Sequence, residues 1–459
     1  MMTEAQALNA LASEDPEAAD EAKAALGWLT NGAGLETVSQ LKLQEFVWYA
    51  LPVKWPMTTG ELIAVTRALG RLFSMVGMER YADVCLSPGT EQILTAYGRG
   101  HEAGIAAYAE AVENSSTAPP DTHLLAWGSV MGPDERAAYD ACAAAVELAI
   151  ASGELSSGAR GWRAKRAALI DRWLTTLPAT PAAREGQSGR HRAGAHHAPG
   201  VSGSWLARIS TERMDAWANS RPGERSRLAA AVLPRLLEET APPSGALPTL
   251  GWLLGHADVG LKLTARHYIP PAVITEAVDR FGWREQLPGA LRQELDVFPL
   301  HTLRGLAQGE MGAIRRAGSS LVLTRTGRLM AEDPVTRWRI GTAALVGADD
   351  GPRPDFAVAV REASLLFLLV SGPAGYEELT RHLARIHAEE GWTSRGRADL
   401  SEAVRREIHG LRHRLWALHL LYTGRASREP LTLTETGVYA ALAALRSRAR
   451  GPRHHAGLG

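Results

Sequence analysis

One heptapeptide pattern occurs twice in the chain and constrains its fold more than any other feature. Residues 321–327 read LVLTRTG and residues 431–437 read LTLTETG, so both have the form L-x-L-T-x-T-G. Alternating Leu and Thr favour a short, half-buried strand, a Thr hydroxyl can cap the helix that follows, and Gly permits a tight entry into that helix. Each copy therefore predicts a strand that leads directly into a helix, with the second Thr as its cap.

Helical sequence patterns precede both copies of this pattern. The resulting order of helices, hairpin and helix is that of a winged helix, in which the hairpin forms the wing. We expect a third, degenerate copy near Leu86, where residues 81–86 look extended and are followed by the turn signal Ser-Pro-Gly-Thr at 87–90. The alternative is that each short hairpin simply covers a small helical core.

The length of 459 residues is too great for one ordinary core and indicates roughly three or four compact units. We predict a mainly α, multi-unit protein with winged-helix-like elements and short β-hairpins at the wings. The predicted organisation is a helical, degenerate winged-helix-like unit at 1–113, a helical segment at 122–177, a disordered linker at 178–204, a helical unit with a winged-helix-like element at 205–345 and a C-terminal winged-helix-like unit at 354–450. The linker is predicted from its Gly, Pro, Ser, His and Arg content, which cannot form a core.

Cysteine usage and hydropathy indicate the compartment. Cys85 and Cys142 lie far apart and neither belongs to a CxxC pair, which argues against a disulfide framework or a thiolate metal site. The acidic N-terminus lacks the basic and apolar regions of a secretory signal. The most apolar run, 363–370, is far shorter than the ~20 residues of a membrane span and predicts a buried helix. We therefore expect a cytoplasmic protein that has no membrane partner.

Charge is segregated along the chain although the formal net charge is zero. Residues 1–113 hold seven Lys and Arg against fifteen Asp and Glu, which gives −8, whereas residues 160–235 hold fourteen against five, which gives +9. Residues 375–459 hold fourteen against nine, which gives +5. This distribution favours either acidic and basic parts that dock on each other or on a partner, or basic parts that meet a polyanion.

Two further segments carry a resemblance to a known family. Residues 263–273 read LTARHYIPPAV and residues 321–339 read LVLTRTGRLMAEDPVTRWR. Together, over about residues 250–345, they resemble a family of uncharacterised actinobacterial proteins of plasmid open-reading-frame type, although Arg266 and His267 stand where that family usually has Gly. The resemblance implies a helical, winged-helix-like fold and no activity or site residue. The tetrapeptide LGWL occurs at 26–29 and again at 250–253, which suggests that the N-terminal unit is a diverged copy.

Binding of duplex DNA would require exposed arginines on and around the helix before each wing. The best candidate helix is 399–421, followed by a basic loop, and the preceding unit offers a second set of arginines at its strand–helix junction. The candidate residues are Arg405, Arg406, Arg412, Arg414, Arg425 and Arg428 in the C-terminal unit and Arg315, Arg316, Arg325 and Arg328 in the preceding unit. The alternative is a solvated helix face paired with Glu402 and Glu407, where exposed ion pairs contribute little.

Other chemistry finds no support in the sequence. His409 and His413 lie four residues apart on one predicted helix face, but no third ligand follows, so we predict no metal site. The chain contains no phosphate-binding GxxxxGK[ST] loop and no G-x-S-x-G elbow, so we predict no enzyme and no cofactor. The recurring tryptophans are expected to be core anchors. They are Trp28, Trp162, Trp173, Trp205, Trp217, Trp252 and Trp283.

Two hypotheses for function remain. The first is a non-enzymatic winged-helix-type regulatory or nucleic-acid-associated protein that binds duplex DNA. The second is a protein-interaction scaffold that uses its winged-helix-like units to bind a protein partner or a second copy of itself.

Overall fold

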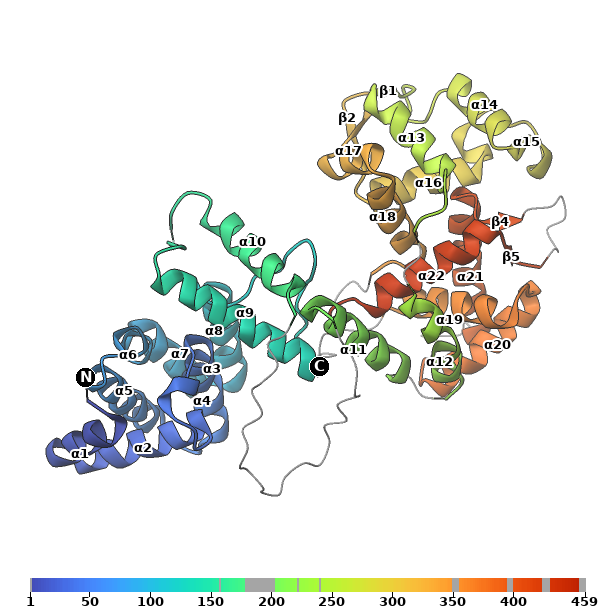
Figure 1. The fold of residues 1–459 in the computed structure, drawn as a ribbon. Helices are drawn as coiled ribbons and strands as arrows, with labels where there is room; N and C mark the ends of the chain where they lie inside the picture. Colours follow the sequence, from blue (N-terminus) through green and yellow to red (C-terminus); the bar gives the residue numbers. More distant parts are fainter. Residues whose placement is uncertain are drawn as a thin grey trace. The chain divides into compact units, whose positions relative to one another are not determined.

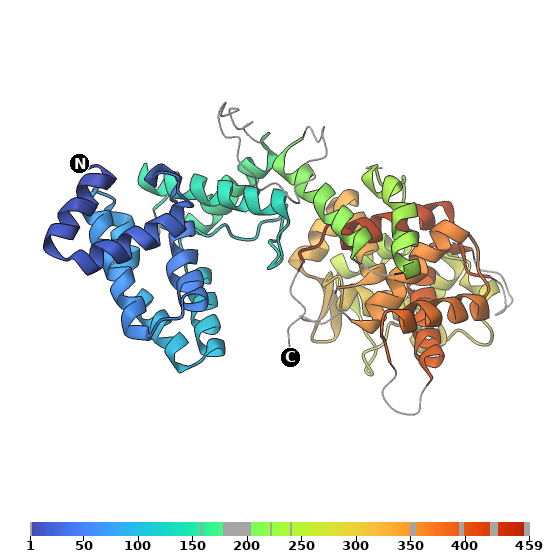
Figure 2. The same cartoon turned by 90° about the horizontal axis from the view of Figure 1, so that it is seen from below.

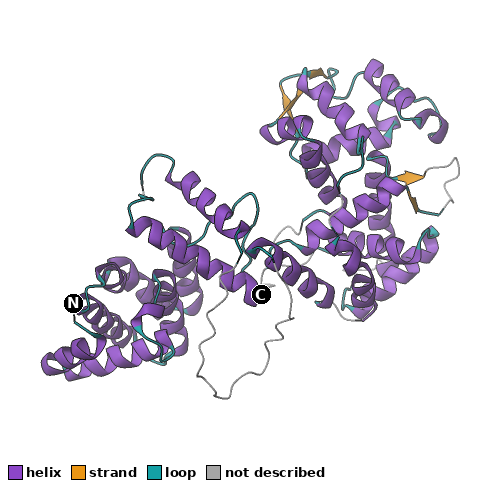
Figure 3. Cartoon of the chain, in the orientation of Figure 1, coloured by secondary structure: helices purple, strands orange, loops and turns teal. Residues whose placement is uncertain are grey.

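The computed structural model describes residues 2–156, 158–177, 203–220, 223–238, 241–348, 355–393, 399–422 and 430–453. These residues form two compact units, an N-terminal unit of residues 1–127 and 131–209 and a C-terminal unit of residues 128–130 and 210–459. Both are mainly helical, and the few short strands are antiparallel (Figure 3). The predicted mainly α class is confirmed. The predicted linker at 178–204 lies outside the described residues except for its last two positions.

The N-terminal unit is built from consecutive helices, coloured from blue through teal to green in Figure 1 and seen from below in Figure 2. They are α1 (Glu4–Glu14), α2 (Pro16–Thr30), α3 (Gln40–Glu45), α4 (Leu51–Lys54), α5 (Thr59–Met75), α6 (Glu79–Leu86), α7 (Pro88–Arg99), α8 (His101–Glu113), α9 (Pro133–Ala151), α10 (Trp162–Thr175) and α11 (Trp205–Asn219). A π-helical turn at Phe46–Ala50 joins α3 to α4, and a 3-10 turn lies at Leu35–Thr37. The boundary between the two units falls inside α11.

The extended stretch predicted at 81–86 is wrong, because these residues belong to helix α6. The Ser-Pro signal that follows starts a second helix instead of closing a strand. Ser87 accepts a hydrogen bond from the amide of Thr90, and Pro88 occupies the first helical position of α7, where its missing N–H costs nothing. Across the described part of the N-terminal unit no residue lies in a strand, so the hairpin expected near Leu86 is not present there.

The two LGWL segments occupy different environments. Residues 26–29 lie near the end of α2, where the Trp28 side chain is 44% exposed, whereas residues 250–253 lie in α13 (Pro248–Asp258), where Trp252 is buried. The tetrapeptide therefore does not mark equivalent positions of a structural repeat. Trp28 and the 39% exposed Trp173 also depart from the expectation that the tryptophans are core anchors, which Trp252 and Trp283 fulfil.

The C-terminal unit begins with part of α11 and with α12 (Gly223–Leu237), followed by two halves of similar organisation. The first half, residues 248–346, contains α13, β1 (Leu261–Lys262), α14 (Pro271–Arg280), α15 (Trp283–Gln286), a 3-10 turn (Glu294–Asp296), α16 (Phe298–Gln308), β2 (Ile314–Ala317), β3 (Ser320–Leu323), α17 (Arg325–Glu332) and α18 (Pro334–Val346). The second half, residues 356–449, contains α19 (Phe356–Ser371), α20 (Tyr376–Glu389), α21 (Leu400–Ala417), β4 (Leu421–Tyr422), β5 (Thr432–Leu433) and α22 (Glu435–Ala449).

The strands of the two halves follow the same order. In the first half the sheet order is β1-β3-β2, all antiparallel, with Leu261 opposite Leu321 and Ile314 opposite Leu323. In the second half β4 pairs with β5, and an antiparallel bridge from Ala374 to Leu431 takes the place of the first strand. Each half thus runs helix, short extended segment, helices, two-stranded hairpin and helix.

The repeated heptapeptide positions the helix after each hairpin. Thr324 accepts a hydrogen bond from the amide of Gly327 at 3.0 Å, and Thr434 accepts one from Gly437 at 2.9 Å. The first Thr of each copy is therefore the cap, and the predicted role of the second Thr is wrong. A Cβ on Gly327 would lie 1.9 Å from the carbonyl oxygen of Ala313, and one on Gly437 would lie 2.1 Å from that of Leu420. Glycine is required because two backbone segments approach closely there.

The two halves pack through equivalent helices. The helix before the first hairpin, α16, contacts the helix before the second hairpin, α21, and α18 contacts α22 (Figure 1). Phe298 of α16 packs edge-on against Trp416 of α21 with ring centroids 4.6 Å apart, and one continuous buried cluster runs through both halves. This arrangement resembles the isologous contact of a symmetric dimer, but it is made within one chain.

The two cysteines and most of the apolar run singled out in the sequence are buried. Cys85 and Cys142 are free and buried, and burial raises the pKa of both thiols, that of Cys142 to about 12. The apolar run at 363–370 lies in α19, most of which is buried. Among the residues that the structure describes, no helix combines the length and the apolar character needed to cross a lipid bilayer.

Candidate nucleic-acid interface

Four of the predicted arginines surround the hairpin of the first half. Arg315 and Arg316 lie on β2, while Arg325 and Arg328 occupy the first and fourth positions of α17 because Thr324 caps that helix. All four are exposed. In the described part of the chain none of them forms an ion pair or a side-chain hydrogen bond. Their positive charges are therefore available to a partner.

Two further cations lie on β1 or in the loop after it and were not identified from the sequence. Lys262 on β1 lies opposite Ser320 of β3, and Arg315 lies opposite Val322 of the same strand. Ser320 and Val322 are two residues apart and point to the same side of the sheet, so Lys262 and Arg315 share the outer face. Arg266, in the loop after β1, is also exposed. We call Lys262, Arg266, Arg315, Arg316, Arg325 and Arg328 the hairpin cation cluster.

Two arginines of the predicted basic helix, α21, form ion pairs with carboxylates of the same chain. Arg414 is 14% exposed, pairs with both carboxylate oxygens of Glu310 at 2.5 Å, and donates to the carbonyl oxygen of Ala344. Arg405 pairs with Glu377 at 2.9 Å and lies 3.9 Å from Glu402. The alternative of a helix face with carboxylate partners therefore describes these two arginines better than a free polyanion surface.

Of the two remaining arginines of α21, Arg412 packs on an aromatic ring and Arg406 is exposed to solvent. The guanidinium of Arg412 lies over the Trp416 ring, 5.6 Å from its centroid. Arg406 is exposed and forms no ion pair within the described residues. Arg425 and Arg428, in the predicted loop before the second hairpin strand, lie outside the described residues.

The arginine of the helix before the first hairpin, α16, is also held in an ion pair. Arg304 of α16 pairs with the fully buried carboxylate of Glu294 at 2.8 Å and donates to the carbonyl oxygen of His267. Glu294 also accepts a hydrogen bond from the amide of Ile269, so this arginine anchors the segment before α14 to α16. Both helices that precede a hairpin thus use arginine for internal structure.

His409 and His413 are packing residues in this geometry. Their rings lie 5.2 Å apart, His413 packs on Phe298 and His409 packs on Tyr376. Burial lowers the pKa of both imidazoles, and the charge of Arg412 lowers it further. In the described residues no group of three or more His, Cys, Asp or Glu side chains could hold a metal ion.

Comparison with known proteins identifies no relative of the chain. No protein-family model, no curated protein and no solved structure matches the chain. The geometry and charge of the hairpin surface are therefore the basis for a functional proposal.

Proposed function

We propose that the C-terminal unit is a tandem of two winged-helix modules that associates with duplex DNA. Both halves have the element order of a winged helix, and the first half has the antiparallel strand order β1-β3-β2 with the β2–β3 hairpin as its wing. The resemblance of residues 250–345 to the plasmid-type family points to the same fold.

The hairpin cation cluster is the observation that carries the proposal. Six exposed cations that form no ion pair with any described residue lie on or next to one three-stranded sheet. Unpaired cations that repel one another favour a polyanionic ligand, since each phosphate contact releases a condensed counterion. Arg325 stands at the first position of α17, where the helix dipole disfavours a positive charge. A bound phosphate would offset that unfavourable interaction.

The contacts that this surface can make are mainly with phosphates. Reading of base edges by a winged helix normally needs an exposed helix in the major groove. Here α16 and α21 pack on each other, and Arg304, Arg405 and Arg414 are held in ion pairs. We therefore expect binding that depends strongly on salt and weakly on sequence, with a slope of log K against log salt of roughly −3.6 to −5.4 for four to six phosphate contacts.

Fluorescence polarisation with a labelled duplex across a salt series tests the proposal on the full chain. Substitution of Arg315, Arg316, Arg325 and Arg328 by Gln should weaken binding at least tenfold and reduce the magnitude of the salt slope by about 3. A charge-matched control replaces the exposed residues Arg160, Arg163, Arg227 and Arg381 by Gln and should retain most of the affinity. Absence of salt-dependent binding at low ionic strength, or an equal loss in the control, would overturn the proposal.

A protein-interaction scaffold is the second candidate. It is favoured by two exposed apolar side chains on the helices that follow the first hairpin, Leu329 on α17 and Val335 on α18, which are 52% and 57% exposed. Leu329→Ser combined with Val335→Ser should leave DNA affinity unchanged under the first proposal. Under the second, it should abolish self-association on a sizing column or the recovery of a stoichiometric partner. Unchanged behaviour in both assays would reject the scaffold.

A further inference from the structure

A hollow of about 330 Å³ lies in the N-terminal unit, and none of the residues of the proposed interface lines it. Its lining comes from α2, α3, the π-helical turn, α8 and α9. Four aromatic side chains contribute to this lining: Trp28, Phe46, Tyr49 and Tyr108. The volume suits a small ligand with one or two rings.

The aromatic side chains are arranged as two ring pairs. Trp28 and Phe46 have centroids 5.1 Å apart, and Tyr49 and Tyr108 have centroids 5.3 Å apart. Trp28 is 44% exposed and Tyr49 is 38% exposed, so a large aromatic surface stays in water although burial would stabilise the fold. Phe46 and Tyr49 lie on the π-helical turn Phe46–Ala50, a rare backbone form that is frequent at functional sites.

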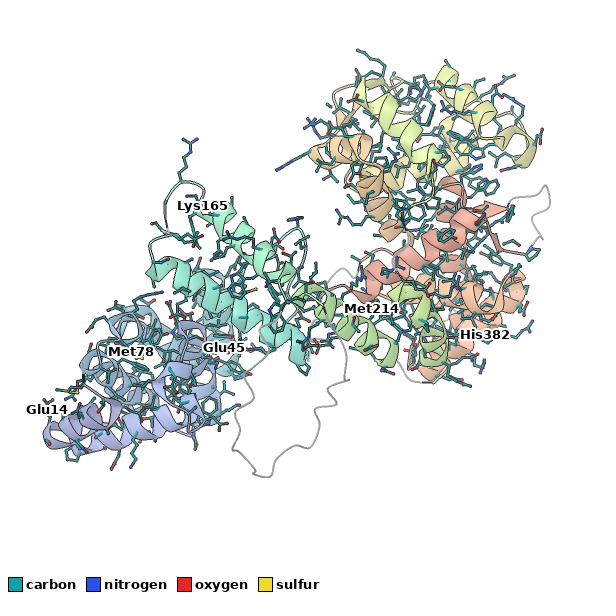
Figure 4. All side chains as sticks on the ribbon, in the orientation of Figure 1. Glu14, Glu45, Met78, Lys165, Met214 and His382 are labelled. Carbon is teal, nitrogen blue, oxygen red and sulfur yellow. The ribbon has the colours of Figure 1, made fainter. Side chains whose placement is uncertain are left out.

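The charges at the hollow select the kind of ligand. Glu45, labelled in Figure 4, pairs with Arg136 at 2.5 Å, so these two opposite charges of the lining offset each other. Arg136 also pairs at 3.0 Å with Asp140, which does not line the hollow. Lys42 is exposed, donates to the carbonyl oxygen of Thr37 at 3.1 Å, and forms no ion pair in the described part of the chain. The remaining unpaired charge in the lining is therefore positive.

A cationic ligand is disfavoured for a second reason. The ammonium group of Lys54 already lies over the Trp28 ring, 5.3 Å from its centroid, so the protein itself provides the cation that this ring face attracts. Burial raises the pKa of Tyr108 to about 12, so its phenol stays neutral and can donate a hydrogen bond. The aromatic side chains can stack on a ligand ring, and the Tyr108 phenol and the Lys42 ammonium can bind an anionic group. Together they fit a ligand whose aromatic ring bears such a group.

We infer that this hollow binds a small planar aromatic carboxylate, with its ring against Trp28 and Tyr49 and its carboxylate on Lys42. The inference is independent of the proposed DNA association, because none of these residues belongs to the C-terminal unit.

Calorimetric titration of the full chain with three indole probes tests this inference. Indole-3-acetate is anionic, indole is neutral and tryptamine is cationic, so they share a ring and differ in charge. We expect indole-3-acetate to bind most tightly and tryptamine least. Lys42→Gln should weaken indole-3-acetate roughly fivefold, the effect of one exposed ion pair, and leave indole unchanged.

Trp28→Ala should weaken both indole-3-acetate and indole, because it removes a ring surface that both probes use. The matched control is Trp173→Ala, since Trp173 is 39% exposed in the same unit and does not line the hollow. Circular dichroism confirms that each variant is folded. Tighter binding of tryptamine, no binding of any probe at millimolar concentration, or an equal loss in Trp173→Ala would overturn the inference.

Discussion

The two halves of the C-terminal unit share a backbone plan and differ in how they use arginine. Both have the same order of elements, the same Thr cap after the hairpin and the same Gly pressed against a carbonyl oxygen. In the first half the arginines around the hairpin are exposed and unpaired. In the second half Arg405 and Arg414 on the helix before the hairpin are held by carboxylates.

The comparison shows that the residues that determine the fold differ from those that determine which positive charges stay free for a partner. The Leu, Thr and Gly positions of the heptapeptide are local and act identically in both halves. The fate of an arginine depends on partners from elsewhere in the chain, as with Glu310, which lies 104 residues before Arg414. A basic helix in the sequence is therefore weaker evidence for a nucleic-acid surface than a cation that the folded chain leaves without a carboxylate.

The largest effect is expected where the two halves are most alike. Gly327→Ala and Gly437→Ala each place a methyl group about 2 Å from a backbone oxygen, at 1.9 and 2.1 Å respectively, so the hairpin and the following helix must move apart. We expect each to lower the free energy of unfolding by about 3 kcal/mol, the upper range for overpacking of a core. Urea denaturation measures this loss.

Gly305→Ala in α16 is the matched control, because its Cβ would meet no atom within 4 Å. It should be neutral or should stabilise by roughly 0.5 to 1 kcal/mol through helix propensity. If Gly327→Ala and Gly437→Ala differ by more than about 2 kcal/mol, the two hairpins are not equivalent in their docking.

The next largest effect on stability is expected at an arginine held in an ion pair, Arg414, compared with an exposed arginine, Arg316. Arg414→Met removes a two-oxygen ion pair and a backbone contact at a mostly buried position, and we expect a loss of about 2 kcal/mol in unfolding free energy. Arg316→Met, at an exposed and unpaired position, should change stability by less than about 0.5 kcal/mol. DNA affinity should respond in the opposite order. Equal effects of both substitutions on stability would contradict the contrast.

Local sequence chemistry predicted much of this fold. The buried helix predicted from the apolar run at 363–370 lies within α19, the helix predicted at 399–421 corresponds to α21, and the strand predicted in 321–327 corresponds to β3. These segments carry strong periodicity or turn signals within a few residues. The error at 81–86 arose because Ser-Pro ends strands and starts helices equally well, so the local signal was ambiguous there.

The candidate site was less predictable than the fold. Arg315, Arg316, Arg325 and Arg328 were identified because they flank a recognisable hairpin. Lys262 was missed because β1 has only two residues, too few for a periodic pattern, and its pairing with β3 joins residues almost 60 positions apart. The exposure of Trp28 could not be predicted either, because the sequence around a single tryptophan in a helix does not tell whether it lies at the surface or in the core.

A smaller effect tests which Thr of the heptapeptide is the cap. Thr324→Ala and Thr434→Ala each remove the side-chain oxygen that accepts a helix amide, and we expect each to cost about 1 kcal/mol of unfolding free energy. Thr326→Ala and Thr436→Ala are matched controls, because the described structure gives their side chains no hydrogen bond, and they should be nearly neutral. Equal losses at both positions of either copy would restore the second Thr as a cap.

The smallest effect concerns a helix break that the second half lacks. After its hairpin the first half has α17 and α18, separated at Asp333 and Pro334, where the second half has the single helix α22. The Asp333 carboxylate accepts hydrogen bonds from the Thr336 hydroxyl, the Thr336 amide and the Val335 amide, which lower its pKa below 3.8. A side-chain NMR titration should give that lower midpoint.

Because the folded-state pKa of Asp333 is lowered, its charge stabilises the fold above the unfolded-state pKa of about 4, and this contribution is lost as pH falls through the folded-state value. Asp333→Asn keeps a capping oxygen and removes the charge, so wild type and variant should differ slightly in stability at pH 7 and converge as the pH falls through the folded-state pKa. The neighbouring exposed residue Glu332 provides the control, since Glu332→Gln should show no such convergence. A stability difference for Asp333→Asn that grows on acidification would mean that this carboxylate is not a charge-assisted cap.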